Sequence, residues 1–552
     1  MNETIRVTYN GNKSLEVLKN TKIIDILSKI TDINKDEVVG VKIGNSLVNM
    51  ENTLKKDATL NFIDANDLAG YKMYQAGLKF ILLVALRELY GKDITLTFDH
   101  SIMRGIHVSV SLGCSVNNEE ILKIKKKVQE LIKADLRIMK LNVSSREVFA
   151  YYNLIGDIPC GYNVLNIRDE FVTLYKLKNY FGYFYTEMPY STACLKNFDI
   201  VALSNNELVL LFPSPHSSSS TLSYVHYEKV IECFKQEKEW LNKVGIPYIY
   251  QVNKWVAKGN VKDLIRLAEV NFDNKIHEVA LKIIAKKSRF VMIAGPSSSG
   301  KTTTSKKLAL DLEAKGYKTL QISVDDYFKD RVDTPKLPDG SLDFESINAI
   351  DVGLLNSDIN KLLSGKGVKL PKFNFISVKK EFGSDEVTIT EDYIILMEGL
   401  HCLNDALTPE IDQSLKYKIY LSPFMPLNVD SNNYISTTDL RLIRRLIRDN
   451  RTRGHDVSKT IATWQSVRRG EEEYIFPYIN TSDVIINTAL VYELGVLRVF
   501  AEPLLFSVDT SSIYYEEARR LLNFLKIYYP ISSEYISDAC VLREFIGGSI
   551  FE

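Results

Sequence analysis

Residues 295–302 read Gly295-Pro296-Ser297-Ser298-Ser299-Gly300-Lys301-Thr302, directly after the apolar run Phe290-Val291-Met292-Ile293-Ala294. The stretch is a complete G-x-x-x-x-G-K-[ST] phosphate loop between a strand-like segment and a helical pattern, which is the setting that this motif requires. That setting disfavours the alternative, a glycine turn that binds no phosphate. The backbone N–H groups of such a loop and the N-terminus of the following helix can surround the phosphates of ATP or GTP. The sequence therefore predicts a nucleotide site.

The predicted site assigns a role to each residue of the loop. The Thr302 hydroxyl is expected to bind Mg²⁺, and Lys301 is expected to reach the phosphates and to act in catalysis. The residues expected to contact ATP in this stretch are Gly295, Ser297, Ser298, Ser299, Gly300, Lys301, Thr302 and Thr303.

Composition limits the classes of protein that this chain can represent. Its 552 residues suggest about three or four domains. The 69 basic side chains balance the 69 acidic ones, so no global field favours nucleic acid or an anionic membrane as partner. Six scattered cysteines without a C-x-x-C pair argue against a zinc site and a disulfide framework, and they predict a reduced, cytoplasmic protein. The most apolar stretch, residues 80–86, is far shorter than the roughly 20 residues that a membrane helix needs, so no membrane partner is expected.

Further apolar segments alternate with helical patterns after the phosphate loop, at residues 319–324, 393–397, 418–421 and 484–486. This alternation predicts a doubly wound, mostly parallel sheet with helices on both faces, spanning residues 289–490. A helical connector (225–288) is expected before it and a C-terminal helical tail (491–552) after it. The fold class is therefore multidomain, with this α/β unit as one part.

Phosphoryl transfer needs a base for the acceptor, an anchor for magnesium and cations for the transferred group. Asp325, in the stretch Ser323-Val324-Asp325-Asp326-Tyr327-Phe328, stands at the end of the second predicted core strand, where ligands bind in open α/β sheets. A carboxylate at that edge faces the phosphates. The alternative is that Asp325 merely caps a loop.

At this point the chain resembles the uridine kinase and phosphoribulokinase family. The resemblance implies that Asp325 is the base that takes the proton from the acceptor hydroxyl and that Phe328 packs on the acceptor. Residues 342–351 are similar to the Asn-Phe-Asp-His-Pro-Asp-Ala pattern of the family, which implies that Glu345 grips ribose hydroxyls. Residues 371–375 are similar to its Pro-x-Tyr-Asp-Phe stretch, which implies that Phe373 lines the acceptor pocket. Met397-Glu398-Gly399 is similar to its Glu-Gly pair, which implies that Glu398 is a magnesium partner.

Six arginines crowd one helical stretch: Arg441, Arg444, Arg445, Arg448, Arg451 and Arg453. Their spacing places four of them on one helix face, which is expected to be strongly self-repelling unless an anion joins it. In the resembled family this is the lid helix, which implies that Arg448 and Arg453 contact ATP phosphates, that Arg448 is catalytic and that Arg445 faces the acceptor. The alternative is a solvated or RNA-binding basic helix.

The front half has two predicted units. Residues 1–66 resemble a TGS domain, the small ubiquitin-like, β-grasp-like fold found at the front of threonyl-tRNA synthetases, in the expected order of their strands and in Asp57-Ala58-Thr59-Leu60 before the last one. Residues 67–224 are similar to the second additional domain of these synthetases, an α+β domain whose paired editing histidines correspond here to Ala76 and Phe80. The resemblance therefore implies no editing activity.

Two other features of the front half carry structural expectations only. His100 and His107 are expected to be lone structural or surface histidines, and Ser217-Ser218-Ser219-Ser220 a flexible loop.

Together these features predict a kinase that uses ATP and Mg²⁺, with the 5′-hydroxyl of a nucleoside as the preferred acceptor. Val378, His455 and Thr463 occupy the positions at which uridine-cytidine kinases read the pyrimidine, and none is the family residue. Another small hydroxylated metabolite, such as a sugar phosphate or a pantothenate-like acceptor, is therefore the alternative within enzymes. A nucleotide-switched regulator associated with RNA or the ribosome is the alternative from another class.

Overall fold

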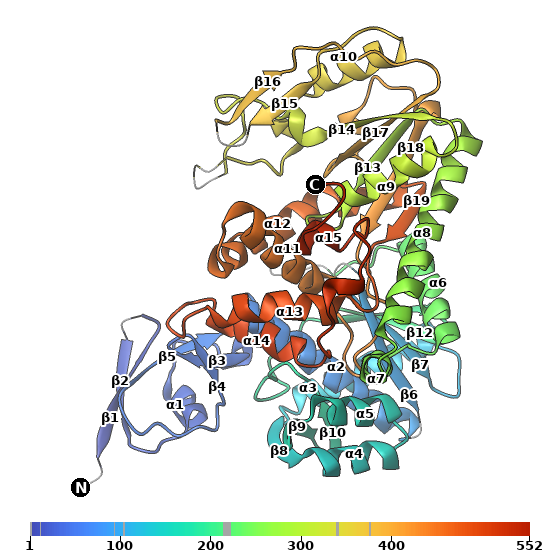
Figure 1. The fold of residues 1–552 in the computed structure, drawn as a ribbon. Helices are drawn as coiled ribbons and strands as arrows, with labels where there is room; N and C mark the ends of the chain where they lie inside the picture. The colour runs from blue at the N-terminus through green and yellow to red at the C-terminus, as the bar shows by residue number, and fades with distance from the viewer. Residues whose placement is uncertain are drawn as a thin grey trace.

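The computed structural model describes residues 3–11, 13–92, 94–102, 105–213, 222–337, 340, 342–374 and 377–552. The serine run 217–220, expected to be a flexible loop, lies outside these residues. A small N-terminal sheet and a parallel-stranded unit lie at opposite ends of the molecule, and C-terminal helices lie between them (Figure 1). None of the described helices is long and apolar enough to cross a membrane.

The N-terminal unit is a five-stranded mixed sheet with one α-helix. Its elements are β1 (Thr4–Tyr9), β2 (Lys13–Leu18), α1 (Ile23–Lys29), β3 (Gly40–Ile43), β4 (Ser46–Val48) and β5 (Ala58–Ile63). The strand order is β2-β1-β5-β3-β4, with β1 and β5 parallel. Helix α1 packs on one face of this sheet. Val7, Val41 and Leu60 point to that face, because alternate strand residues point to the same side, and they are fully buried.

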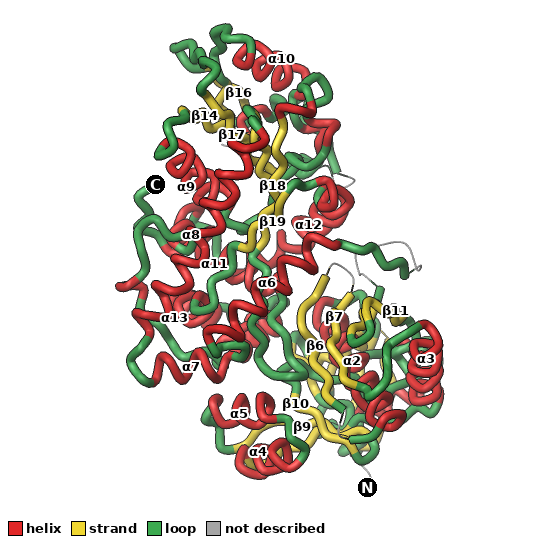
Figure 2. Tube along the Cα trace, turned by 90° about the vertical axis from the view of Figure 1, so that its right-hand side faces the viewer, coloured by secondary structure: helices red, strands yellow, loops and turns green. Residues whose placement is uncertain are grey.

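The middle unit is built around the long buried helix α2 (Leu68–Tyr90). A four-stranded sheet, β11-β12-β7-β6, and a three-stranded sheet, β10-β9-β8, pack with it (Figure 2). Its other elements are β6 (Thr95–Ile102), β7 (Gly105–Ser111), α3 (Asn118–Lys133), β8 (Met139–Ser144), α4 (Ser145–Leu154), α5 (Ile158–Ile167), β9 (Phe171–Leu177), β10 (Tyr180–Tyr183), β11 (Asp199–Ser204) and β12 (Glu207–Leu211). Ala76 and Phe80 are buried in the core formed by α2.

His100 and His107 are buried, as expected of structural histidines, but they are partners of each other and not lone residues. They face each other across β6 and β7, and their rings stack with centroids 4.8 Å apart. The His100 ring also stacks on Phe234, and burial holds the pKa of His100 well below its usual value. Sequence spacing could not show this pairing because it depends on the register of the two strands.

Helices α6 (Glu228–Val244), α7 (Ile249–Ala257) and α8 (Val261–Lys286) connect the middle unit to the parallel sheet. The strands of this sheet are β13 (Phe290–Ala294), β14 (Lys318–Ser323), β17 (Tyr393–Gly399), β18 (Lys416–Ser422) and β19 (Val484–Asn487). Their order is β14-β17-β13-β18-β19, and every pair is parallel. The predicted parallel sheet is therefore confirmed.

Both faces of this sheet are buried. Val291 and Ile293 of β13 belong to one hydrophobic core, and Phe290 and Met292, which point the opposite way, belong to another. The remaining elements of the unit are α9 (Lys301–Glu313), α10 (Val352–Leu363), β15 (Pro371–Asn374), β16 (Lys379–Phe382), α11 (Thr437–Arg453) and α12 (Val457–Tyr474).

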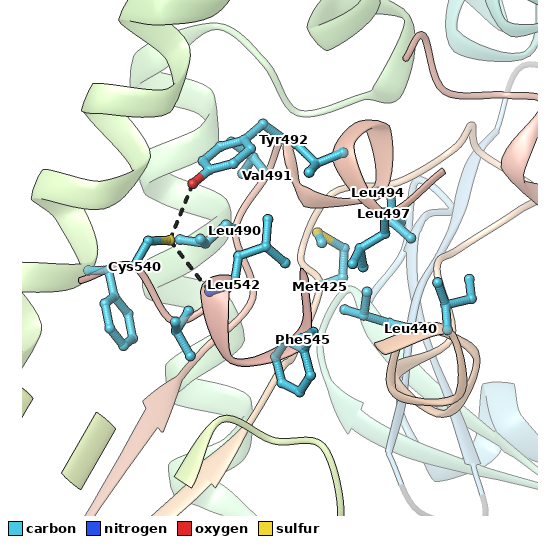
Figure 3. Close-up of a cluster of buried hydrophobic side chains, with 14 of the residues drawn as sticks. Met425, Leu440, Leu490, Val491, Tyr492, Leu494, Leu497, Cys540, Leu542 and Phe545 are labelled. Atoms are coloured by element: carbon cyan, nitrogen blue, oxygen red, sulfur yellow. Dashed lines mark hydrogen bonds between the residues drawn. The ribbon is translucent and has the colours of Figure 1, made fainter. Parts of the chain in front are cut away.

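The C-terminal segment contains α13 (Glu493–Phe506), α14 (Tyr515–Leu525) and the short helix α15 (Arg543–Ile546). It shares a hydrophobic core with the parallel sheet and with α11. Figure 3 shows Leu542 and Phe545 beside Leu440 of α11 and Leu494 of α13. Helix α14 also touches the N-terminal unit, where the backbone N–H of Leu47 donates to Glu516 (3.0 Å).

Candidate active site

The phosphate loop runs from the end of β13 to the first turn of α9. Ser298 and Gly300 have φ angles of 60° and 85°, the left-handed region that the tight loop requires. A Cβ on Gly295 would lie 2.6 Å from the carbonyl oxygen of Leu421, so only glycine fits there. Lys301 Nζ donates to the Gly295 carbonyl at 3.0 Å and so lies over the loop.

Two carboxylates reach the same edge of the sheet. Glu398 on β17 is in register with Ile293 of β13 on one side and with Ser323 of β14 on the other. Asp325 follows β14 in a turn of 3₁₀ helix (Val324–Tyr327). Because the carboxyl ends of parallel strands meet at one edge, both side chains lie close to the phosphate loop.

Asp325 lies among protein atoms but keeps contact with solvent. Desolvation by the surrounding protein is the main effect on the pKa of Asp325 and raises it, while the positive charge of Lys301 opposes the rise. The side chain itself is exposed, so water screens part of this shift. The charge of Arg453 also acts on Asp325. Asp325 lies near the positive charges of Lys301 and Arg453. These charges can neutralise a phosphoryl group, so the Asp325 carboxylate can act as a base beside it.

Glu398 and Thr302 offer oxygen ligands of the kind that Mg²⁺ prefers. The Thr302 hydroxyl donates to Glu398 Oε1 at 3.4 Å. Burial raises the pKa of Glu398 to about 7 against the pull of Lys301. Among the described residues no group of three or more His, Cys, Asp or Glu side chains could hold a metal, so an ion here would also need phosphate or water ligands.

The predicted acceptor residues lie beside each other. Phe328, Phe344 and Phe373 pack edge to face, with ring centroids 5.2 to 6.2 Å apart. Phe328 and Phe373 are almost fully buried, so they form a packed wall. Burial and the nearby negative charge of Glu471 raise the pKa of Glu345 to about 7.

The arginines of α11 are neutralised by carboxylates of the chain itself, which supply the anions expected to relieve their self-repulsion. Asp449, one turn after Arg445, lies 3.2 Å from Arg445, 2.7 Å from Arg448 and 3.6 Å from Arg453. The three arginines expected to contact substrates therefore share the carboxylate of Asp449. The other arginines pair with carboxylates from α12, α13 and the C-terminus: Arg441 with Glu471, Arg444 with Glu493 and Arg451 with Glu552.

Two of these arginines donate hydrogen bonds to backbone carbonyls of the phosphate loop. Arg441 Nε donates to the Ser297 carbonyl at 2.8 Å, and Arg444 Nη1 to the Ser298 carbonyl at 3.4 Å. Arg445, expected to face the acceptor, donates to the Ser297 hydroxyl at 2.9 Å and also acts electrostatically with Glu345. The N-terminal half of α11 is thus a buried support for the loop.

Glu544 is a site residue that sequence reasoning missed. Its Oε2 accepts hydrogen bonds from both the backbone N–H and the hydroxyl of Thr303. These residues are 241 positions apart, and no local pattern around Glu544 marks it.

Residues 290–493 match the model of the "Phosphoribulokinase / Uridine kinase family". The C-terminal part of this chain carries a kinase domain of that family. The uridine kinase of Deinococcus deserti is 28% identical over 195 residues, which are 35% of this chain and 84% of that one. A uridine kinase of Staphylococcus aureus (strain JH9) is 29% identical over 206 residues, 36% of this chain and 88% of that one. With this domain and its complete phosphate loop, the protein is an ATP-dependent kinase.

A solved structure of a possible uridine kinase from Bacillus stearothermophilus is also similar, with 18% identity and a TM-score of 0.26, over 39% of this chain and 98% of that chain. The family match leaves out residues 1–289, so the TGS-like and synthetase-like assignments and the domain boundaries stay predictions.

Proposed function

We propose that this kinase transfers the γ-phosphoryl group of ATP to a hydroxyl of a small acceptor, and that a nucleoside is this acceptor. The observation that carries the proposal is the convergence of Lys301, Asp325 and Glu398 at one sheet edge, beside a complete phosphate loop. This is the set of groups that phosphoryl transfer uses: a phosphate clamp, a base and a metal anchor.

The residues divide the work as follows. The loop amides and Lys301 hold the phosphates, and Asp325 accepts the proton of the acceptor hydroxyl as its oxygen attacks phosphorus and ADP leaves. Thr302 and Glu398 would hold Mg²⁺, which neutralises charge on the phosphates when bound. Arg445, Arg448 and Arg453, which share the carboxylate of Asp449, would stabilise the transferring group.

A nucleoside acceptor is supported by the ribose side of the site. Glu345 lies beside the phenylalanine wall, and at a pKa of about 7 its carboxyl can either donate to or accept from sugar hydroxyls. The similar proteins named above are uridine kinases. Val378 has no hydrogen-bonding side chain and the Thr463 hydroxyl donates to the Thr460 carbonyl (3.1 Å), so neither supplies the imidazole or carboxamide with which the family reads a pyrimidine. We therefore propose the nucleoside class without a preferred base.

The test is ADP release from Mg·ATP with uridine, cytidine, purine nucleosides, sugar phosphates and pantothenate as acceptors. Asp325→Asn should lower kcat by about 10²–10⁴ and leave the KM for ATP nearly unchanged. Asp326→Asn is the matched control, because the Asp326 carboxylate accepts from Lys372 (3.1 Å) and the Phe373 amide (3.3 Å) instead of facing the phosphates.

The outcomes separate the parts of the proposal. Stimulation by nucleosides alone would support the acceptor class, and stimulation by a sugar phosphate or pantothenate alone would replace it. If Asp325→Asn and Asp326→Asn reduced kcat equally, Asp325 would not be the base.

A further inference from the structure

The C-terminal segment, residues 537–552, places a carboxylate on the first turn of α9, directly after the phosphate loop. Glu544 Oε2 accepts from the backbone N–H of Thr303 at 3.1 Å and from the Thr303 hydroxyl at 2.9 Å. Thr303 lies in the first turn of α9, the helix N-terminus that a phosphate loop directs at its anion. The carboxylate therefore uses both donors of a residue expected to contact ATP, and a phosphate oxygen cannot replace it while it stays.

The segment is packed onto the loop as part of the folded core. A Cβ on Gly300 would lie only 2.5 Å from Cγ2 of Val541, so Val541 packs directly against the loop. Val541, Leu542 and Phe545 are fully buried, the last two within the cluster of Figure 3. The Phe545 ring also lies 4.8 Å below the guanidinium of Arg444, the arginine that supports the loop. Glu544 is thus held in place on both sides by buried neighbours.

Basic side chains around the loop bind this segment. Arg451 donates to the carbonyl of Glu544 at 3.2 Å and to the carboxylate of Glu552 at 2.5 Å. Lys306 and Lys307, both on α9, donate to backbone carbonyls of the segment. These are cations of the kind that attract phosphate, and here they hold a part of the chain itself.

The charge of Glu544 also opposes a nucleotide. Its carboxylate accepts from Thr303, the residue next to Thr302, so it adds negative charge beside the proposed metal anchor. A triphosphate brings several negative charges to the same place. Coulomb repulsion between these charges and Glu544 is stronger in a partly buried site than in water.

We propose that residues 537–552 form an autoinhibitory plug, in which Glu544 occupies the donors of Thr303 and ATP binds only after this carboxylate has left them. The inference rests on the ATP site of the proposed function. ATP and the plug compete for one set of donors, so loss of the Glu544 charge favours ATP.

The experiment measures the Kd of Mg·ATP by isothermal titration calorimetry for the full chain and two variants. Glu544→Gln keeps the shape and removes the charge, and it should tighten the Kd by about tenfold to a hundredfold, the equivalent of a lost charged hydrogen bond. Glu552→Gln is the matched control: it removes a carboxylate of the same segment that pairs with Arg451 and does not touch the loop. Its Kd should stay within about twofold of that of the unmodified chain.

A second measurement uses the unmodified chain, so its result does not depend on whether a variant folds correctly. Hydrogen exchange of peptides from residues 537–552 should speed up when Mg·ATP is added, because the plug is displaced. An unchanged or weaker Kd in Glu544→Gln, or slower exchange of these peptides with ATP, would overturn the plug while leaving the ATP site intact. No ATP binding to any of the three proteins would overturn the proposed function and the plug with it.

Discussion

The ion pair between Arg444 and Glu493 gives a quantitative test of how α11 supports the phosphate loop. Both side chains are fully buried, and Arg444 Nη2 lies 2.5 Å from Glu493 Oε2. Arg444 also donates to the carbonyls of Thr488 (2.9 Å) and Ser298 (3.4 Å). Arg444→Met removes these donors and leaves a carboxylate buried without its counter-charge, for which a cost of about 3–5 kcal/mol is expected.

The loss of stability caused by Arg444→Met should increase as pH rises. Burial already raises the pKa of Glu493 although Arg444 opposes it. Without Arg444 this pKa rises further, so the folded variant binds a proton that the unfolded chain releases. A raised carboxyl pKa stabilises the fold at low pH, and that stability is lost as pH rises through the folded pKa. The destabilisation by Arg444→Met should therefore be smaller at pH 5 than at pH 8.

The double variant Arg444→Met/Glu493→Leu removes both charges and should be more stable than Arg444→Met alone, with a coupling of about 2–3 kcal/mol. Since a chain of several units does not unfold in one step, the assay is hydrogen exchange of peptides from β13 and α9 in increasing urea. Arg451→Met is the control, because Arg451 is exposed and its loss should cost about 1 kcal/mol or less. Equal stability of the single and double variants at both pH values would refute the argument.

Two further predictions concern the nucleotide site. Because burial places the pKa of Glu398 near 7 and Mg²⁺ binds the ionised carboxylate, the Mg²⁺ concentration for half-maximal activity should fall as pH rises from 6 to 8. In Glu398→Gln this pH dependence should be lost; a dependence that persisted there would assign it to another group. Ser298 has a φ of 60°, so Ser298→Gly should keep the KM for ATP within a few-fold, whereas Ser298→Val should raise it at least tenfold, about 1–2 kcal/mol of backbone strain. Steady-state kinetics decides the point, and equal KM values for the two variants would contradict it.

The parts of the site that the sequence predicted are those fixed by local geometry. The phosphate loop needs particular backbone angles at Ser298 and Gly300, and its motif carries them. Asp325 and Glu398 follow apolar runs that had to be strands of one parallel sheet, so their ends meet at one edge. In the N-terminal unit the apolar alternation and turn residues indicated a small β-rich unit, but the order of the strands in the sheet depends on pairing between distant segments.

The remaining parts depend on long-range contacts that leave no periodic signal. Glu471 and Glu493 lie 30 and 49 residues beyond the arginines that they neutralise, so α11 alone looked like an uncompensated basic helix. Glu544 stands in an ordinary helical pattern, and only the packing of the C-terminal segment brings it to Thr303.

Helix α11 links the front half of the molecule to the phosphate loop. At its N-terminal end Asp439 is buried between Lys72 of α2 (3.2 Å) and Arg520 of α14 (2.9 Å), which joins the middle unit and the C-terminal helices to one carboxylate. One turn further, Arg441 and Arg444 hold the carbonyls of the loop. A helix is stiff along its axis, and the N-terminal half of α11 is fixed by buried charge pairs at Asp439, Arg441 and Arg444, so Asp439 cannot shift without straining the contacts of the two arginines with the loop. The position of the loop amides is therefore set jointly by α2, α14 and the parallel sheet, so the front half contributes to the geometry of the nucleotide site.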